Sequence, residues 1–178
     1  MIKKYFKLRS FTVIIIFTVL SACAVAPEGV EPITGFELDR YLGKWYEIAR
    51  LDHSFERGLI RVTADYSFRD DGGIKVVNRG FNPEKNQWEE AIGKAYFIGS
   101  HNIGQLKVSF FGPFYGGYNI LALDKKFYQY ALVSGPDRSY LWILARTSKL
   151  NPSTVNQLVD KARQLGFPVE NLIYVPHD

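Results

Sequence analysis

Short runs in which apolar and polar residues alternate recur along the chain from residue 44 onward. Residues 62–68 show the pattern most clearly, because every second side chain there is apolar. Such alternation is typical of strands with one buried face. Turn sequences separate the runs, and Gly72 and Gly73 offer the positive φ angles that a tight hairpin needs. We predict eight strands, at residues 44–50, 62–68, 74–81, 88–98, 105–111, 118–123, 128–133 and 140–145.

One segment near the C-terminus follows a helical period instead. Asn151 can cap its start and Pro152 suits its first turn, while Gly166 and Pro168 end it. Its apolar side chains fall on one stripe, formed by Val155, Leu158, Val159, Ala162 and Leu165. Such a stripe is far more often a packing face than a binding element. We therefore expect the helix to dock outside the strands, followed by a short final strand at residues 171–175.

The connections between the predicted strands are short, which favours a closed up-and-down barrel over a sandwich with Greek-key crossovers. The chain has 178 residues, enough for one domain, and its aromatic content of 15% suits strands and apolar pockets. Gly93 is expected to bend the long strand at residues 88–98. The pattern thus predicts an all-β fold, an eight-stranded antiparallel barrel over residues 35–178 with one α-helix packed outside.

Residues 1–22 differ in character from the rest of the chain. Residues 1–9 are basic, and residues 11–20 form an apolar run that is too short to span a bilayer comfortably. This arrangement predicts a secretory signal peptide. The leader holds four of the 22 Lys and Arg residues and no acid, so 18 basic residues remain against 18 acidic ones. Without the leader, no basic excess is left to indicate a nucleic-acid partner.

The sequence Leu20-Ser21-Ala22-Cys23 resembles the lipobox of bacterial lipoproteins, in which the cysteine becomes the acylated first residue of the mature chain. The alternative is an ordinary signal peptide cut near Ala22, which leaves a stray thiol. Cys23 is the only cysteine and cannot form an internal disulfide. The next residue is Ala24, not the aspartate that commonly retains such proteins at the inner membrane. The resemblance therefore implies an outer-membrane anchor and a barrel that faces the periplasm. Pro27, Gly29 and Pro32 in a segment with little periodicity predict an extended tether over residues 23–34.

Several stretches of the chain resemble the conserved motifs of the lipocalin family. They are residues 41–50, which contain the Gly-x-Trp sequence of the first strand, and residues 130–133 and 141–147, which are similar to the second and third stretches. Residues 55–58 and 110–118 are similar to bacterial lipocalins, with kinship to the apolipoprotein D type. The resemblance extends from about residue 36 to residue 175 and implies a barrel that holds an apolar ligand.

The resemblance also implies that Gly43, Trp45 and Arg146 are structural residues. In lipocalins the indole plugs the closed base of the barrel and the guanidinium stacks across it, a cation–π contact worth about 1–2 kcal/mol when desolvated. One stretch departs from the family. Leu123-Asp124 lacks the usual threonine, and Lys125-Lys126-Phe127 lengthens the turn, so the geometry of this hairpin stays open.

Strand parity predicts which side chains face the barrel interior. If Arg146 faces the interior, every second residue before it does so too, and Trp142 and Tyr140 then face inward. Trp142 is therefore the best aromatic ligand contact. The same rule, started from Trp45 on the first strand, turns Glu47 and Ala49 inward. The predicted ligand contacts are Trp142, Tyr140, Tyr118, Phe110, Phe97, Asn78, Val76, Ala49 and Glu47. Alternatively, each of these side chains fills the barrel without touching a ligand.

Two further features have more than one interpretation. Glu47 inside an apolar barrel must be paired or hydrogen-bonded, so it either anchors a ligand headgroup or satisfies a neighbouring Tyr or Arg. Phe111, Phe114 and Tyr115 lie in the predicted loop beside Gly116 and Gly117. Exposed aromatic side chains there would suit a membrane surface or a second copy in a homodimer, unless the loop covers its own rings.

The resemblance implies a lipid-binding lipoprotein that holds fatty acids or lysophospholipids for storage or transport at the outer membrane. An enzyme is the main rival, with Glu47 as a base, since a few lipocalins isomerise lipids. Such chemistry needs a free thiol or an activated base. Cys23 is expected to be acylated, and His53, His101 and His177 lack metal-ligand spacing. We expect no enzyme activity, no metal and no cofactor. The third candidate is an envelope structural or interaction protein, which a tightly packed barrel would favour.

Overall fold

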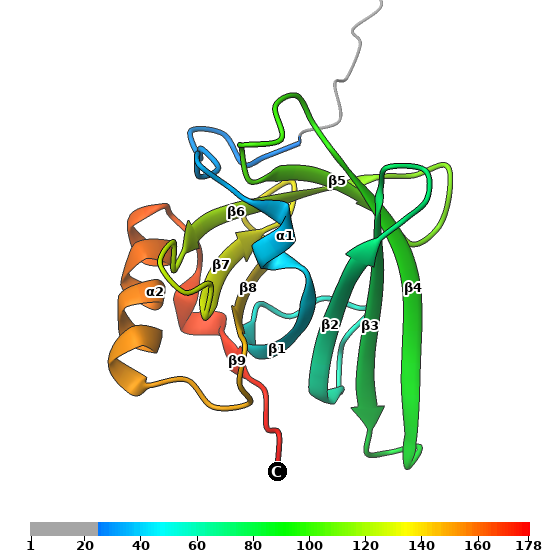
Figure 1. Cartoon of the computed structure of the whole chain (residues 1–178). Helices are drawn as coiled ribbons and strands as arrows, with labels where there is room; N and C mark the ends of the chain where they lie inside the picture. The colour runs from blue at the N-terminus through cyan, green and yellow to red at the C-terminus, as the bar shows by residue number, and fades with distance from the viewer. Residues whose placement is uncertain (1–24) are drawn as a thin grey trace, which may run out of the picture.

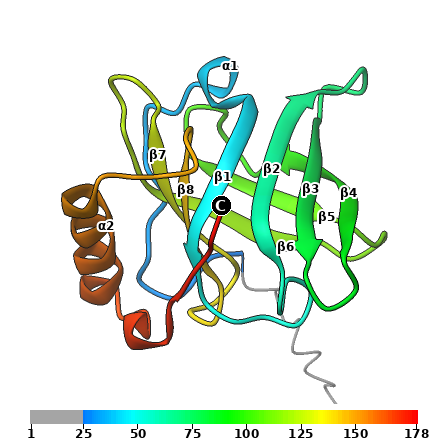
Figure 2. The ribbon, with the colours of Figure 1, turned by 90° about the horizontal axis from the view of Figure 1, so that it is seen from below.

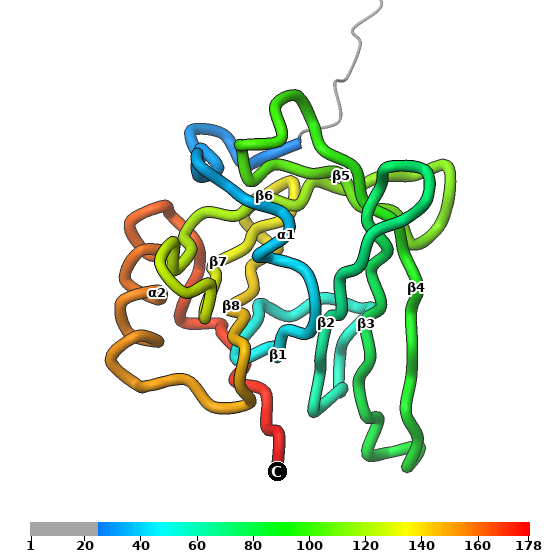
Figure 3. Tube along the Cα trace, in the orientation of Figure 1, coloured from blue at the N-terminus to red at the C-terminus, as the bar shows by residue number. Residues whose placement is uncertain are grey.

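The computed structural model describes residues 25–178, so the predicted signal peptide and the predicted acylation at Cys23 lie outside the described residues. Eight antiparallel strands close into a barrel (Figures 1 and 3). They are β1 (Gly43–Arg50), β2 (Ile60–Phe68), β3 (Ile74–Asn82), β4 (Gln87–Phe97), β5 (Gln105–Ser109), β6 (Gly116–Leu123), β7 (Tyr130–Ser134) and β8 (Leu141–Ala145). Each strand pairs with the next along the chain, and β1 pairs with both β2 and β8, which closes the barrel. The predicted up-and-down barrel is confirmed.

The observed bounds of each strand lie within two residues of the predicted ones, and two of the differences have a clear physical cause. β5 ends at Ser109, two residues earlier than predicted, because the chain leaves the sheet at Phe110 and loops toward β6. β7 begins at Tyr130, because Tyr128 takes a positive φ of 56° in the preceding turn. Asp124 holds this turn, since its Oδ1 accepts hydrogen bonds from two backbone N–H groups of the lengthened segment. The departure from the family motif therefore forms a turn that Asp124 caps.

The helix α2 (Pro152–Gln164) packs outside the barrel, as predicted. The Asn151 side chain caps it by accepting a hydrogen bond of 2.9 Å from the Ser153 backbone N–H. Leu158 and Ala162 on its inner face are buried. They meet outward-facing side chains of the sheet in one apolar cluster, whose sheet members include Ile48, Leu121, Leu132, Leu141 and Ile143. Figure 2 shows α2 beside β7 and β8, on the side of the barrel away from β3 and β4.

The C-terminal segment returns to the barrel after α2. A single 3-10 turn (Val169–Asn171) leads into β9 (Ile173–Tyr174), which pairs antiparallel with β1 on its outer side. The predicted final strand is therefore present, but it is shorter than the range of residues 171–175.

A short helix, α1 (Leu38–Tyr41), precedes β1 and helps to close one end of the barrel. Sequence periodicity could not reveal it, since one turn is shorter than the window that a helical pattern needs. Trp45 is fully buried there, and its Nε1 donates a hydrogen bond of 2.7 Å to the Tyr41 carbonyl oxygen. The Arg146 guanidinium stacks 3.9 Å above the Trp45 ring centroid. This is the arrangement that the resemblance implied for the closed base.

The part of the predicted tether that the structure describes lies against the barrel. Val30 is buried with the helix-side cluster, and the Ile33 backbone N–H donates to the Ile120 carbonyl oxygen at 2.8 Å. The Asn119 side chain donates to the Val25 carbonyl oxygen, also at 2.8 Å. The Pro and Gly content of this segment did not indicate that it packs on β6.

Candidate functional site

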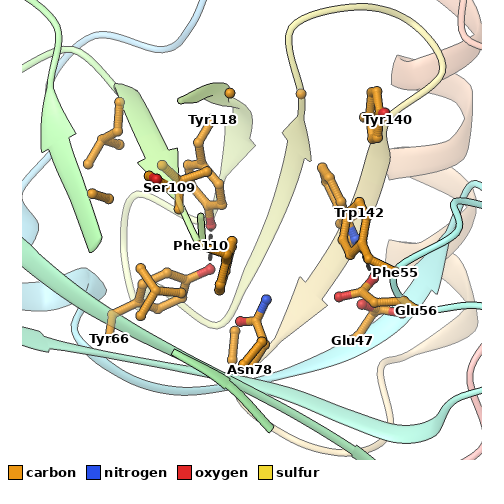
Figure 4. A pocket seen from close by; sticks show the side chains of 18 of the residues that line it. Glu47, Phe55, Glu56, Tyr66, Asn78, Ser109, Phe110, Tyr118, Tyr140 and Trp142 are labelled. Atoms are coloured by element: carbon orange, nitrogen blue, oxygen red, sulfur yellow. Dashed lines mark hydrogen bonds between the residues drawn. The ribbon is translucent and has the colours of Figure 1, made fainter. Parts of the chain in front are cut away.

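A cavity of about 610 Å³ lies inside the barrel. This volume is in the range that sites for small molecules occupy. Most of the wall is apolar and comes from inward-facing residues of β2 to β6 and β8, among them Val62, Ile74, Val76, Ala95, Leu106, Val108 and Leu144. Figure 4 shows two main polar places on the wall, Tyr66 with Tyr118 on one side and Glu47 with Glu56 on the other, besides the single side chains of Asn78 and Ser109.

Most of the side chains predicted from parity line this cavity. They are Glu47, Val76, Asn78, Phe110, Tyr118, Tyr140 and Trp142. Parity succeeds because these positions lie on strands, or at strand ends, where each side chain alternates between the two faces of the sheet. Whether they touch a ligand stays a prediction.

Ala49 and Phe97 do not line the cavity. The predicted inward placement is wrong for Ala49, whereas Phe97 does face the barrel interior. The pairing of β1 with β8 shifts register between Glu47 and Ala49, and this irregularity turns Ala49 toward the helix-side cluster. Phe97 lies inside the barrel, where it stacks on His101 with ring centroids 4.4 Å apart and makes a tilted contact with Phe36 at 6.0 Å. It fills space beside the base instead of bordering the cavity.

A chain of three tyrosine hydroxyls forms the first polar place. The Tyr118 hydroxyl oxygen lies 2.7 Å from that of Tyr41 and 2.9 Å from that of Tyr66. Burial raises the pKa of all three phenols, so each keeps its proton and acts as a neutral hydrogen-bonding group. Tyr41 and Tyr66 were not among the predicted site residues, although Tyr66 shares the inward phase of Val62 and Ala64.

The second polar place joins β1 to the loop of residues 51–59. Arg50 Nη1 donates a hydrogen bond of 2.6 Å to Glu47 Oε1, and both side chains are buried. Trp142 Nε1 donates to Glu56 Oε2 at 3.1 Å. The carboxyl groups of Glu47 and Glu56 lie side by side on the cavity wall (Figure 4). Burial raises the pKa of both acids, so the two carboxyl groups share a proton more readily than exposed acids do.

His53 packs behind this carboxyl pair. Its Nε2 lies 3.2 Å from Glu56 Oε2, but neither ring nitrogen forms an aligned hydrogen bond, and the residue is only 6% exposed. Burial lowers the pKa of His53 to about 4, so the ring is neutral at pH 7. The sequence singled out Glu47 but not Arg50, His53 or Glu56, because only the path of the loop brings them to β1 and Trp142.

Two other polar side chains of the wall have atoms without protein partners. Ser109 Oγ and Asn78 Oδ1 are buried and accept or donate no hydrogen bond. Buried polar atoms are usually paired, so these two are available to an occupant of the cavity.

Across residues 25–178, no group of three or more His, Cys, Asp and Glu side chains is arranged to hold a metal ion. Within the same residues, no helix has both the length and the apolar content needed to cross a membrane.

The loop aromatics Phe111 and Phe114 are 79% and 78% exposed, whereas the Tyr115 ring packs near Tyr96, with ring centroids 6.3 Å apart. The loop therefore does not cover its own phenylalanine rings.

Comparison with known proteins matches a family described as a lipocalin-like domain to residues 36–177. Outer membrane lipoprotein Blc of Vibrio cholerae is 51% identical over 94% of this chain and 98% of its own length. Outer membrane lipoprotein Blc of Escherichia coli K12 is 54% identical over 84% of each chain. The solved structure of insecticyanin from the tobacco hornworm Manduca sexta superposes with a TM-score of 0.69, at 21% identity, over 86% of each chain.

Proposed function

The chain belongs to the lipocalin family, and we propose that it is a lipoprotein that holds a fatty acid or a lysophospholipid in its barrel, for storage or transport at the outer membrane. The observation that supports this most is the largely apolar cavity of about 610 Å³, whose wall carries a limited set of polar groups. Such a cavity suits a molecule with one long apolar part and a polar end.

The proposed location follows from the relatives and from the leader. Two relatives that are more than half identical to this chain are named outer membrane lipoproteins. The sequence around Cys23 matches the lipobox pattern, and Val25, two residues later, packs against the barrel at Asn119. We therefore propose that an acylated Cys23 holds the barrel close to the periplasmic face of the outer membrane.

Binding without chemistry is the function that we favour over catalysis. In the described chain, no Cys or His side chain lines the cavity, and Ser109 Oγ has no base within hydrogen-bonding distance. Glu47, the base considered from the sequence, is held by Arg50 at 2.6 Å. The open lumen also argues against a structural protein whose barrel is filled by its own side chains.

Tryptophan fluorescence offers a direct test. Trp142 lines the cavity, whereas Trp45 is buried in the base and Trp88 is 58% exposed on β4. Residues 23–178 with Cys23→Ser should show saturable quenching when titrated with lysophosphatidylcholine or palmitic acid. Trp142→Phe should still bind in a competition assay but lose most of the signal. If neither lipid gives saturable binding, the lipid-carrier proposal is wrong.

A further inference from the structure

The wall of the cavity has one acidic section, made where the loop of residues 51–59 meets β1. Glu47 and Glu56 both line the cavity and are only 3% and 6% exposed. Figure 4 shows the two carboxyl groups side by side, next to Trp142 and Phe55. Two carboxyl groups in a poorly solvated wall are costly unless a positive charge or a proton accompanies them.

Within residues 25–178, Arg50 is the one cationic side chain that contacts this section. Arg50 bonds Glu47 through Nη1, but its Nη2 donates to the backbone carbonyl oxygens of Glu56 and Leu59, at 2.8 and 3.2 Å. Arg50 does not line the cavity, and His53 is neutral at pH 7. When both carboxyl groups are ionised, one negative charge therefore remains uncompensated and faces the lumen.

The neighbouring charged groups do not cancel this charge. Arg57 pairs with Asp52 at 2.7 Å on the exposed side of the loop. Arg79 is the one cationic residue that lines the cavity in the described part of the chain, and Glu90 holds it at 2.5 Å. Among the described residues, no second cation reaches the pair, so the remaining charge is balanced either by a proton that the two carboxyl groups share or by a cation of the occupant that takes the place of that proton.

Aromatic rings lie along the wall next to the acidic section, Trp142 and Phe55 beside the carboxyl groups and Tyr140 beyond Trp142 (Figure 4). Tyr140 and Trp142 stack with ring centroids 6.2 Å apart, and Phe55 stacks on Tyr140 at 6.4 Å. All three side chains line the cavity. Aromatic faces combined with a carboxylate form the kind of site that binds quaternary ammonium groups, because the ring faces carry negative electrostatic potential.

Buried nitrogens of the same cluster also lack partners. Both ring nitrogens of His53 and Nε of Arg50 are buried without a hydrogen bond. Neither Arg50 nor His53 lines the cavity, so these nitrogens belong to the packing behind the carboxyl pair and do not contact an occupant.

We propose that Glu47, Glu56, Trp142, Tyr140 and Phe55 form a subsite for the ammonium headgroup of a single-chain lipid. The inference rests on the proposed function, since it requires that the cavity hold the acyl chain. The carboxylates supply the counter-charge and the rings supply the faces on which the methyl groups pack. A free fatty-acid carboxylate is disfavoured at this place because it would meet two acidic groups.

The test compares three lipids of equal chain length on residues 23–178 with Cys23→Ser. Lysophosphatidylcholine carries the ammonium group, lysophosphatidic acid has only the phosphate, and palmitic acid has only a carboxylate. We expect lysophosphatidylcholine to bind at least tenfold more tightly than either of the others. Choline without an acyl chain should bind at least a hundredfold more weakly than lysophosphatidylcholine.

Variants then assign the preference to the subsite. Glu56→Gln keeps the acceptor oxygen for Trp142 but removes a charge, and it should lower the affinity for lysophosphatidylcholine about tenfold while leaving lysophosphatidic acid unchanged or tighter. The matched control is Glu90→Gln, which removes a lining carboxylate that Arg79 already neutralises. Phe55→Leu removes one exposed ring and tests the aromatic part if Glu56→Gln does not fold.

The outcomes separate this inference from the broader proposal. Equal affinities of the wild-type protein for the three lipids would overturn the ammonium subsite and leave the lipid-binding cavity intact. Choline binding as tightly as lysophosphatidylcholine would overturn the assignment of a lipid headgroup. Unchanged selectivity in both Glu56→Gln and Phe55→Leu would place the preference elsewhere, while failure of all three lipids to bind would overturn the proposed function itself.

Discussion

Replacing Arg146 by alanine tests the account of the closed base. The guanidinium stacks on Trp45 at 3.9 Å and donates to the backbone carbonyl oxygens of Lys44, Arg40 and Tyr128, at 2.9, 2.8 and 3.2 Å. The stack is worth about 1–2 kcal/mol. Each hydrogen bond contributes roughly 0.5 kcal/mol, a discounted value because the guanidinium is partly exposed and water can replace it. The free energy of unfolding should therefore fall by about 3 kcal/mol.

Urea unfolding followed by circular dichroism measures this loss, with Arg146→Lys as an intermediate case. The lysine keeps the positive charge but cannot reproduce three bonds in a fixed fork, so about half of the loss should remain. Arg163→Ala is the matched control, because this arginine pairs only with Asp160 on the exposed surface of α2 and should cost less than about 0.5 kcal/mol.

Two results would refute the reasoning about Arg146. A loss of stability no larger than that of the Arg163→Ala control would mean that the stack does not support the base. Loss of lipid binding in a fully folded Arg146→Ala protein would mean that this residue belongs to the ligand site, although it does not line the cavity.

Two further predictions concern the pH dependence of stability and the packing of the barrel wall. The pKa of His53 is lowered to about 4 in the folded state, so below about pH 6.5 the unfolded chain takes up a proton that the folded chain excludes, and stability falls as the pH drops toward 4. Between pH 7 and pH 5, His53 should lower the free energy of unfolding by on the order of 1–2 kcal/mol. Urea unfolding of His53→Phe should therefore show a fall over this pH range that is smaller than that of the wild type by the same amount. Equal falls in the two proteins would contradict the assignment to His53. A Cβ at Gly93 would lie 2.8 Å from the Ser109 carbonyl oxygen, so Gly93→Ala should lower stability by roughly 1–3 kcal/mol. Gly116→Ala, where a Cβ meets nothing within 4 Å, is the control, and equal effects of the two substitutions in thermal unfolding would contradict the packing argument.

The sequence by itself determined the eight strands, their closure into a barrel and the two ends of α2. Alternation over residues 62–68 is a local property of the chain, and it orients Val62, Ala64 and Tyr66 inward because a strand turns every second side chain to the same face. Asn151 and Pro152 mark the start of α2 for an equally local reason, since they act on the backbone of the first turn. The same local reasoning placed Trp142 and Tyr118 on the cavity wall.

Tertiary structure decided where the polar groups of the cavity meet. Ala49 faces the helix because the register of β1 against β8 shifts beside it, and no periodic pattern records such a shift. Glu56 reaches Trp142 across a separation of 86 residues only because the loop after β1 folds back over the barrel. Strand periodicity specifies the face of the sheet to which a side chain points. The residues that this side chain contacts across a closed barrel depend on the strand register and on the paths of the loops, which the packing of the whole chain sets.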